Sequence, residues 1–485
     1  MSLSRLGLLL LLLVAAPTTP IADTGLGIEL SKTRFDLLET PDIRVAGAAP
    51  GSRVTLRARS TDRDGTVWTS RAVFLADAEG RVDVARMAPV EGTYGETDAR
   101  GLLWSMVPVA EAEEPAYIAL SGRDRTRKLR QAFTREQRLG EAPIRLTIEA
   151  TAGTDTATVA IERWFITRAV TEEPLRHEVL RGKLYYPADR GPAGNPGVVT
   201  LAGSGGGLLE EHSRFLASHG FTVLAVGLFR YEDRPAEGVD IALEYVRDGA
   251  DWLKALVGHD RIGLLGISYG SQPALLAPAL FPGVAAATVA LVPTHAHNQG
   301  VRYGFWPRFL GLDRAFMTVG GEALPYPVLS VQRWPYIRAG VFRVPTNIVG
   351  RDAYLDAWTS PEGRAAEIPV EKAGIPILLV SGTEDGQWPS SFSGDAVMAR
   401  LAAHKAGAGA EHIKIEGAGH QIVKLPADVS WGDTFGVNPH PSASGPLFGV
   451  SLGTPADNAR GQVTLWRETV RFLTQHLQEK GPVRN

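Results

Sequence analysis

Two serines stand in the pattern Gly-x-Ser-x-Gly, in which a serine at a sharp turn acts as a nucleophile. Ser268 lies at the centre of residues 266–270, and Ser451 at the centre of residues 449–453. A nucleophile elbow needs a strand before the serine and a helix after it. Ser268 follows the apolar run 262–265 and precedes a helix-like segment, whereas Ser451 lies between two prolines with neither element predicted beside it. The sequence therefore predicts Ser268 as the nucleophile and Ser451 as a loop residue.

A serine hydroxyl needs a base to take its proton and an acid to orient that base. Asp385 follows the predicted strand 377–380, and His420 follows the predicted strand 413–415. Their order after Ser268 is serine, acid, histidine, which is the order in α/β-hydrolases. Two alternatives stay open here. Asp385 is also a candidate helix N-cap, with Glu384 as the substitute acid, and His420 is also a candidate ordinary loop histidine.

The loop at residues 202–207, Ala-Gly-Ser-Gly-Gly-Gly, follows the predicted strand 198–201. An oxyanion hole needs two backbone N–H donors, one from the residue after the nucleophile and one from such a loop. We expect these donors at Tyr269 and Ser204, with Gly203 or Gly205 as the alternatives to Ser204. A phosphate cradle is the alternative, but the lysine of a P-loop is missing. The candidate residues lining a substrate pocket are Gly203, Gly205, Tyr231, Trp306 and Trp388.

Composition excludes several other chemistries. The chain has 485 residues and no cysteine, which excludes a disulfide scaffold, Cys-ligated zinc and a cysteine nucleophile. Its 50 basic and 53 acidic residues give a net charge of −3. A nucleic-acid binder usually has an excess of basic residues, so this balance argues against that class. His295 and His297 form an H-x-H pair, but no carboxylate motif accompanies them, so a pocket-lining or surface role is favoured over metal binding. The sequence predicts neither a metal nor an organic cofactor.

Two regions differ in the periodicity of their apolar residues. Residues 28–165 contain short alternating runs, including 53–59, 71–76 and a hairpin around residues 153–155, with a helix only near residues 127–138. Such spacing is typical of a β-sandwich. Residues 172–485 contain near-continuous apolar runs, which is typical of buried parallel strands, and helical patterns between them. An α/β domain is predicted here. Its aromatic-rich stretch 301–359 is a candidate cap insertion or acyl-pocket wall, against a simple packing insertion.

Residues 1–22 have the features of a secretory signal. Arg5 is the only charged residue, and the apolar run 6–16 is shorter than the roughly 20 residues that span a bilayer. We expect a signal peptide and export of the chain, to the periplasm or out of the cell, with an uncleaved membrane anchor or a cytoplasmic location as the alternatives. That anchor is the only membrane contact predicted.

The sequence that follows the leader resembles the acyl-CoA thioesterase / bile acid-CoA:amino acid N-acyltransferase family. The resemblance covers nearly the whole chain after residue 22. In the first region it rests on segments such as Trp68-Thr-Ser70, Gly80-Arg-Val-Asp83 and Gly101-Leu-Leu-Trp-Ser-Met106. In the second region it rests on Gly205-Gly-Gly-Leu-Leu-Glu210, Leu216-Ala-Ser-His-Gly220, Gly263-Leu-Leu-Gly-Ile-Ser268 and Gly417-Ala-Gly-His420.

The resemblance implies an immunoglobulin-like domain followed by an α/β-hydrolase domain, with Ser268, Asp385 and His420 as the triad. Family members with serine tend to hydrolyse thioesters, and those with cysteine tend to transfer acyl groups to amines. Hydrolysis of an acyl thioester, such as acyl-CoA, is therefore expected. Departures are the leader and the residues after Ser268, where a lysine and an acidic residue are usual. Three alternatives remain: an exported carboxylesterase, lipase or amidase, an acyl-CoA:amino acid N-acyltransferase, and a non-catalytic binding protein.

Overall fold

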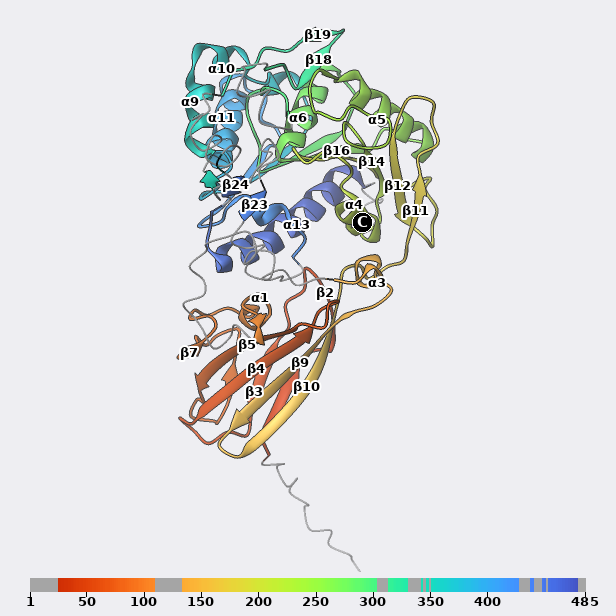
Figure 1. The fold of residues 1–485 in the computed structure, drawn as a ribbon. Coiled ribbons are helices and arrows are strands. Elements are labelled where there is room, and N and C mark those ends of the chain that lie inside the picture. Colours follow the sequence, from red (N-terminus) through yellow and green to blue (C-terminus); the bar gives the residue numbers. More distant parts are fainter. Residues whose placement is uncertain are drawn as a thin grey trace, which may run out of the picture.

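The structure is a computed structural model that describes residues 25–109, 133–302, 313–329, 350–426 and 452–478, together with Phe342 and the strands at 346–348, 437–439 and 447–450. Figure 1 shows an N-terminal β domain below and an α/β domain above it. The predicted leader, residues 1–22, and Trp306 lie outside the described residues. No helix within the described ranges is long and apolar enough to cross a membrane.

The β domain contains two sheets whose strands alternate buried and exposed residues. A seven-stranded sheet has the order β2-β10-β9-β4-β5-β7, with β8 paired to β5, and a three-stranded sheet has the order β1-β3-β6. The hairpin expected around residues 153–155 is present between β9 and β10. The strands are β1 Gly27–Leu30, β2 Arg34–Asp36, β3 Ile43–Ala46, β4 Arg53–Thr61, β5 Val67–Leu75, β6 Val82–Asp83, β7 Glu91–Gly92, β8 Val107–Pro108, β9 Ile144–Ala152 and β10 Asp155–Trp164.

Two short helices accompany these strands. α1 covers Gly101–Trp104, and all four of its residues are buried. α3 covers Arg135–Leu139 and begins at a capping box between Thr134 and Gln137. α3 falls within the helix expected near residues 127–138, and residues 127–132 lie outside the described residues.

The α/β domain is built on an eight-stranded sheet of order β11-β12-β14-β13-β16-β17-β21-β22. The first two strands pair antiparallel, and β14 and all later strands run parallel to one another. Near-continuous apolar runs form the five central parallel strands. These strands are buried throughout, because both faces of the sheet are covered by helices. The strands are β11 Val170–Pro174, β12 Gly182–Pro187, β13 Gly197–Leu201, β14 Thr222–Val226, β16 Ile262–Ile267, β17 Ala287–Leu291, β21 Ile377–Gly382 and β22 Glu411–Ile415.

Helices cover both faces of this sheet. α4 (Glu210–Ser218) and α13 (Pro455–Leu477) pack on one face, and α13 runs between the sheet and the β domain (Figure 1). α5 (Glu244–Val257), α6 (Ser271–Leu280) and α11 (Ser390–Ala403) pack on the opposite face. Alternate residues of each strand join one or the other of two buried clusters. Because the strands run parallel, their carboxyl ends lie at one common edge of the sheet, where ligands bind in open α/β sheets.

The candidate cap stretch 301–359 lies only partly within the described residues. Its described part includes β18 (Met317–Val319), which pairs with β15 (Ile241–Ala242), then β19 (Glu322–Ala323) and α9 (Arg351–Thr359), which precedes α10 (Pro361–Ala365). Phe316 and Met317 are fully buried. The start of β18 therefore packs into the domain, whereas β19 is exposed.

The surroundings of Ser451 differ from the prediction. Ser451 itself lies outside the described residues, but β24 (Leu447–Val450) ends directly before it and α13 begins four residues later. β24 pairs with β20 (Thr346–Ile348) and β23 (Val437–Pro439), which a local sequence pattern does not indicate. A strand and a helix therefore flank both Gly-x-Ser-x-Gly motifs.

Candidate active site

Ser268 stands at the turn between β16 and α6, in the short 3₁₀ segment Ser268–Gly270. Its φ is +56°, a left-handed conformation that is rare for serine and is expected at a nucleophile elbow. The two glycines of the motif allow this turn. A Cβ at Gly266 would overlap the carbonyl oxygen of Gly270, and a Cβ at Gly270 would overlap that of Leu201. The small flanking residues are thus required by close backbone packing.

Substitution of Gly270 by alanine is expected to destabilise the protein. The added Cβ has only backbone to displace, so we expect a loss of about 3 kcal/mol in the free energy of unfolding. Gly407→Ala is the matched control, because its Cβ would meet only an ordinary contact with Leu401 at 3.6 Å. Denaturant unfolding of both variants measures the difference. Equal stabilities would contradict the packing argument.

The structure brings Ser268, His420 and Asp385 into one hydrogen-bonded chain. His420 Nε2 lies 3.0 Å from Ser268 Oγ, and His420 Nδ1 lies 2.8 Å from Asp385 Oδ2. Asp385 is 1% exposed and His420 is 8% exposed, whereas Ser268 is partly accessible. Such a chain lets the imidazole take the proton of the serine while the carboxylate holds the ring in the required tautomer.

Contacts in the loop after β21, which we call the acid loop, distinguish Asp385 from its neighbour Glu384. Asp385 Oδ1 accepts hydrogen bonds from the backbone N–H of Gln387 at 3.0 Å and of Trp388 at 3.4 Å, so its carboxylate is fixed. The Glu384 side chain is 53% exposed and lies 3.8 Å from the Arg351 guanidinium. The carboxylate that reaches His420 is therefore that of Asp385.

The glycine-rich loop lies beside the nucleophile. β13 pairs with β16 so that Leu201 faces Gly266, and residue 203 follows at the same edge. A Cβ at Gly203 would be 3.1 Å from the Ile267 oxygen and 3.8 Å from Ser268 Oγ. Gly203 is thus in contact with Ser268, and the backbone of Ser204 follows directly. Gly205 is exposed, and its carbonyl accepts a hydrogen bond from Arg230 at 3.3 Å.

Two of the predicted pocket residues have other surroundings. Trp388 is 2% exposed and packs edge-on against the His420 ring at 5.7 Å, so it supports the imidazole from the protein side. Its indole N–H donates to the Val292 oxygen at 3.1 Å. Tyr231 lies near Glu210 and Lys183 on the α4 side, where burial and a hydrogen bond to Glu232 raise its pKa to about 12.

Aromatic side chains surround Tyr269, which follows the nucleophile. Its ring lies 5.4 Å from both Phe316 and Trp388, and its hydroxyl lies 3.1 Å from that of Tyr354. Phe316 and Tyr354 come from the stretch 301–359, so the described part of this stretch contributes to the wall behind the elbow. Tyr354 was not among the predicted site residues, because its position on α9 carries no local motif.

A second Ser-His-Asp chain lies outside this site. Ser381 Oγ is 2.8 Å from His412 Nε2, and His412 Nδ1 is 3.2 Å from Asp395 Oδ1. Ser381, however, is fully buried within β21, whereas Asp395 is 55% exposed. A substrate carbonyl cannot reach the Ser381 oxygen, so hydrogen-bond geometry alone does not make this group a catalytic site.

The H-x-H pair is buried and hydrogen-bonded to protein groups, which corrects the expected pocket-lining or surface role. His297 Nδ1 lies 2.8 Å from the Pro325 oxygen, and its Nε2 accepts from the Met317 N–H at 2.9 Å. His295 Nδ1 lies 3.0 Å from Ser393 Oγ. Within the described ranges no cluster of three or more His, Asp or Glu residues is arranged to hold a metal. Burial lowers the pKa of both histidines to about 4.

These buried histidines predict acid sensitivity. The pKa of His297 falls from 6.5 to about 4 on folding, so between these values the unfolded chain binds a proton that the folded chain does not. Stability therefore decreases as the pH falls through this window. His297→Gln keeps a donor and an acceptor without titrating and is expected to flatten the dependence by up to about 1.4 kcal/mol per pH unit. Thermal unfolding from pH 4 to 7 tests this, with His404→Gln, at an exposed histidine, as the control.

Comparison with known proteins places both domains in one family. Residues 39–177 match the description "Acyl-CoA thioester hydrolase/BAAT N-terminal region", and residues 241–479 match "BAAT / Acyl-CoA thioester hydrolase C terminal". Acyl-coenzyme A thioesterase 1 of Homo sapiens is 30% identical over 90% of this chain and 93% of its own length. The chain belongs to the acyl-CoA thioester hydrolase/BAAT family. Acyl-coenzyme A thioesterase 6 of Homo sapiens is 28% identical over 91% of this chain and 94% of its own length.

The family assignment agrees with the order of the two domains. The first match covers most of the β domain, and the second contains Ser268, Asp385 and His420. Among solved structures, a thermostable esterase from Pseudomonas putida ECU1011 overlaps 64% of this chain and 84% of its own, with a TM-score of 0.36 and 12% identity. The residue at the centre of the Gly-x-Ser-x-Gly motif within the second match is Ser268.

Proposed function

We propose that this protein is a serine hydrolase that cleaves acyl-CoA thioesters to a fatty acid and CoA. The observation that carries the proposal is the hydrogen-bonded chain from Ser268 through His420 to Asp385, in a member of the acyl-CoA thioester hydrolase/BAAT family. Ser268 is the nucleophile, His420 the general base and Asp385 the orienting acid.

In the first step Ser268 Oγ attacks the thioester carbonyl while His420 Nε2 takes its proton. The oxyanion that forms accepts hydrogen bonds from the backbone N–H of Tyr269 and of Ser204, which is supported by the contact of the preceding Gly203 with Ser268. The tetrahedral intermediate collapses, the C–S bond breaks and His420 returns the proton to the leaving thiolate. Water, deprotonated by His420, then releases the acid from Ser268.

The leaving group explains why serine suffices. A thiol ionises near pH 8.5, so the thiolate is expelled more easily than an amine or an alkoxide. The oxyanion donors therefore need to stabilise the transition state of a thioester by less than they would need to for an amide. A water nucleophile completes the cycle, whereas acyl transfer to an amine remains the less favoured alternative for a serine enzyme.

Turnover of a long-chain acyl-CoA and of the matching oxygen ester tests the proposal. We expect the thioester to give the higher kcat/KM, with release of one free thiol for each acid formed. Hydrolysis of the oxygen ester with the acyl-CoA left intact would overturn the thioesterase proposal. It would support the second candidate, an exported esterase on the same scaffold.

One observation favours that second candidate. Residues 1–22 have the pattern of a secretory signal, and an exported enzyme would not meet intracellular CoA. This second candidate requires that the leader direct export, and sequencing of the N-terminus of the purified protein from separated cell fractions tests this. A chain that keeps residues 1–22 in the cytoplasmic fraction would contradict export.

We also infer that the two packed sheets of the β domain form an immunoglobulin-like sandwich.

A further inference from the structure

The loop before His420 is held by elements on two sides. On the first side lies the acid loop: Thr383 Oγ1 accepts from the Gly417 N–H at 2.9 Å, and the Glu384 N–H donates to the Ala418 oxygen at 2.9 Å. These bonds join the loop of the base to the loop of the acid. They leave the N–H of Gly419, adjacent to His420, to be satisfied from elsewhere.

The second side is the N-terminal end of α13. Asn458 is fully buried, and its Oδ1 accepts a 2.6 Å hydrogen bond from the Gly419 N–H. Its Nδ2 donates to the Leu452 oxygen at 3.1 Å, and the Thr454 N–H donates to the Gly417 oxygen at 3.1 Å. Asn458 thus fixes the residue directly before the imidazole, although the two are 39 positions apart.

The second Gly-x-Ser-x-Gly motif has a structural role in this contact. Gly453, its last residue, has a φ of +83°, and a Cβ there would overlap the Gly419 backbone nitrogen. Glycine is therefore needed for the close approach of the 452–454 turn to the histidine loop.

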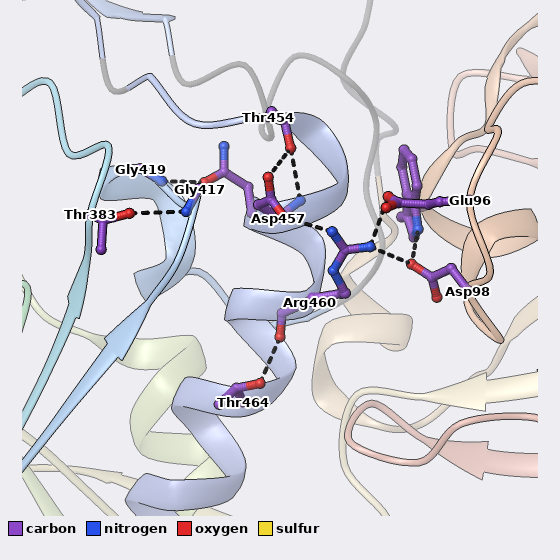
Figure 2. Close-up of polar contacts among 11 residues, drawn as sticks. Glu96, Asp98, Thr383, Gly417, Gly419, Thr454, Asp457, Arg460 and Thr464 are labelled. Atoms are coloured by element: carbon purple, nitrogen blue, oxygen red, sulfur yellow. Dashed lines mark hydrogen bonds and ion pairs between the residues drawn. The ribbon is translucent and has the colours of Figure 1, made fainter.

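The same end of α13 is attached to the β domain. Arg460 donates to Asp457 at 2.6 Å, to Glu96 at 2.8 Å and to Asp98 at 3.4 Å. Asp457 in turn accepts from the hydroxyl of the helix N-cap, Thr454, at 2.5 Å. Figure 2 shows this line of contacts running from Glu96 and Asp98 through Arg460 and Asp457 to Thr454, beside Gly417 and Gly419.

We propose that Asn458 is a positioning residue for His420, and that Arg460 links this end of α13 to the β domain so that the domain supports the histidine loop. The proposal rests on the function proposed above, in which His420 is the base. It assigns the β domain a role in catalysis without contact with substrate. A displacement of about 1 Å in a catalytic group lowers rates by about 10²-fold, so loss of this hydrogen bond has a measurable effect.

The first test replaces Asn458 by leucine, which has a similar size and no acceptor. We expect kcat for acyl-CoA to fall by about 10²-fold with KM little changed, and Ser268 to react correspondingly more slowly with a fluorophosphonate. Asn458→Asp keeps an oxygen for the Gly419 N–H but loses the donor to the Leu452 oxygen, so its kcat should lie between those of wild type and Asn458→Leu. Asn195→Leu is the matched control, because Asn195 is a buried amide with two hydrogen bonds at the opposite end of β13. It should lose stability but not kcat.

The second test separates the link to the β domain from general contact between domains. Arg460→Ala removes the link and, since the ion pair is partly exposed, should lower kcat by about three- to fivefold. Arg467→Ala is its control: Arg467 lies on the same helix and donates to the Leu38 oxygen of the β domain at 2.9 Å. Equal kcat values for the two variants would overturn the link.

The outcomes distinguish this proposal from the proposed function. If the wild-type chain neither hydrolyses acyl-CoA nor reacts with the fluorophosphonate at Ser268, the proposed function is wrong. If the wild-type chain does both and Asn458→Leu keeps its kcat while remaining folded, the positioning role is wrong. A loss of kcat equal in Asn458→Leu and Asn195→Leu would also overturn it, because the effect would then follow stability alone.

Discussion

Replacement of Ser268 by alanine is expected to reduce hydrolysis of acyl-CoA by about 10⁵- to 10⁶-fold, as loss of a serine nucleophile does in other triad enzymes. The variant lacks the oxygen that lies 3.0 Å from His420 Nε2, so no acyl-enzyme forms. The backbone donors remain, and a residual rate above that of water is expected from them. Thiol release measures the loss of hydrolysis, and labelling by a fluorophosphonate measures in parallel the loss of the reactive hydroxyl.

Ser451→Ala provides the control for this result, because it alters the other Gly-x-Ser-x-Gly motif and keeps the Ser268 oxygen that is bonded to His420, so it should leave the rate within about twofold of wild type. Ser381→Ala is a second control, since it breaks the buried Ser381–His412 hydrogen bond without touching the site. An inactive Ser451→Ala together with an active Ser268→Ala would overturn the assignment of the nucleophile.

Replacement of Asp385 by asparagine is expected to lower kcat by about 10⁴-fold with the fold intact. Asp385 Oδ1 accepts from two backbone N–H groups, so an amide oxygen would take that position and its NH₂ would face His420. The imidazole would then have to accept at Nδ1 and carry its proton on Nε2, where it cannot receive the proton of Ser268. Steady-state release of thiol from acyl-CoA measures the loss in kcat.

Glu384→Gln tests whether the neighbouring carboxylate shares this role. Glu384 is exposed and lies near Arg351, so its substitution should change kcat by less than about twofold. A large loss in Glu384→Gln, with Asp385→Asn active, would show that Glu384 is the acid.

The sequence by itself determined the domain classes and the order of the reactive residues. Buried parallel strands are apolar along their whole length, so the runs at 198–201, 222–226, 262–265 and 377–380 were recognisable without tertiary information. Because parallel strands end at one edge, residues that follow different strands are brought together there. Ser268, Asp385 and His420 each follow such a strand, which is why their proximity was predictable from spacing.

Only the tertiary structure decided which side chains meet within that edge. Glu384 and Asp385 are adjacent, and the backbone N–H groups of residues 387 and 388 select Asp385. Trp388 packs behind His420, and Asn458 reaches Gly419 from a helix at the far end of the chain. Periodicity reports which residues are buried but not which distant residues pack against each other. The partners of the catalytic loops therefore follow from the packing of α13 between the sheet and the β domain.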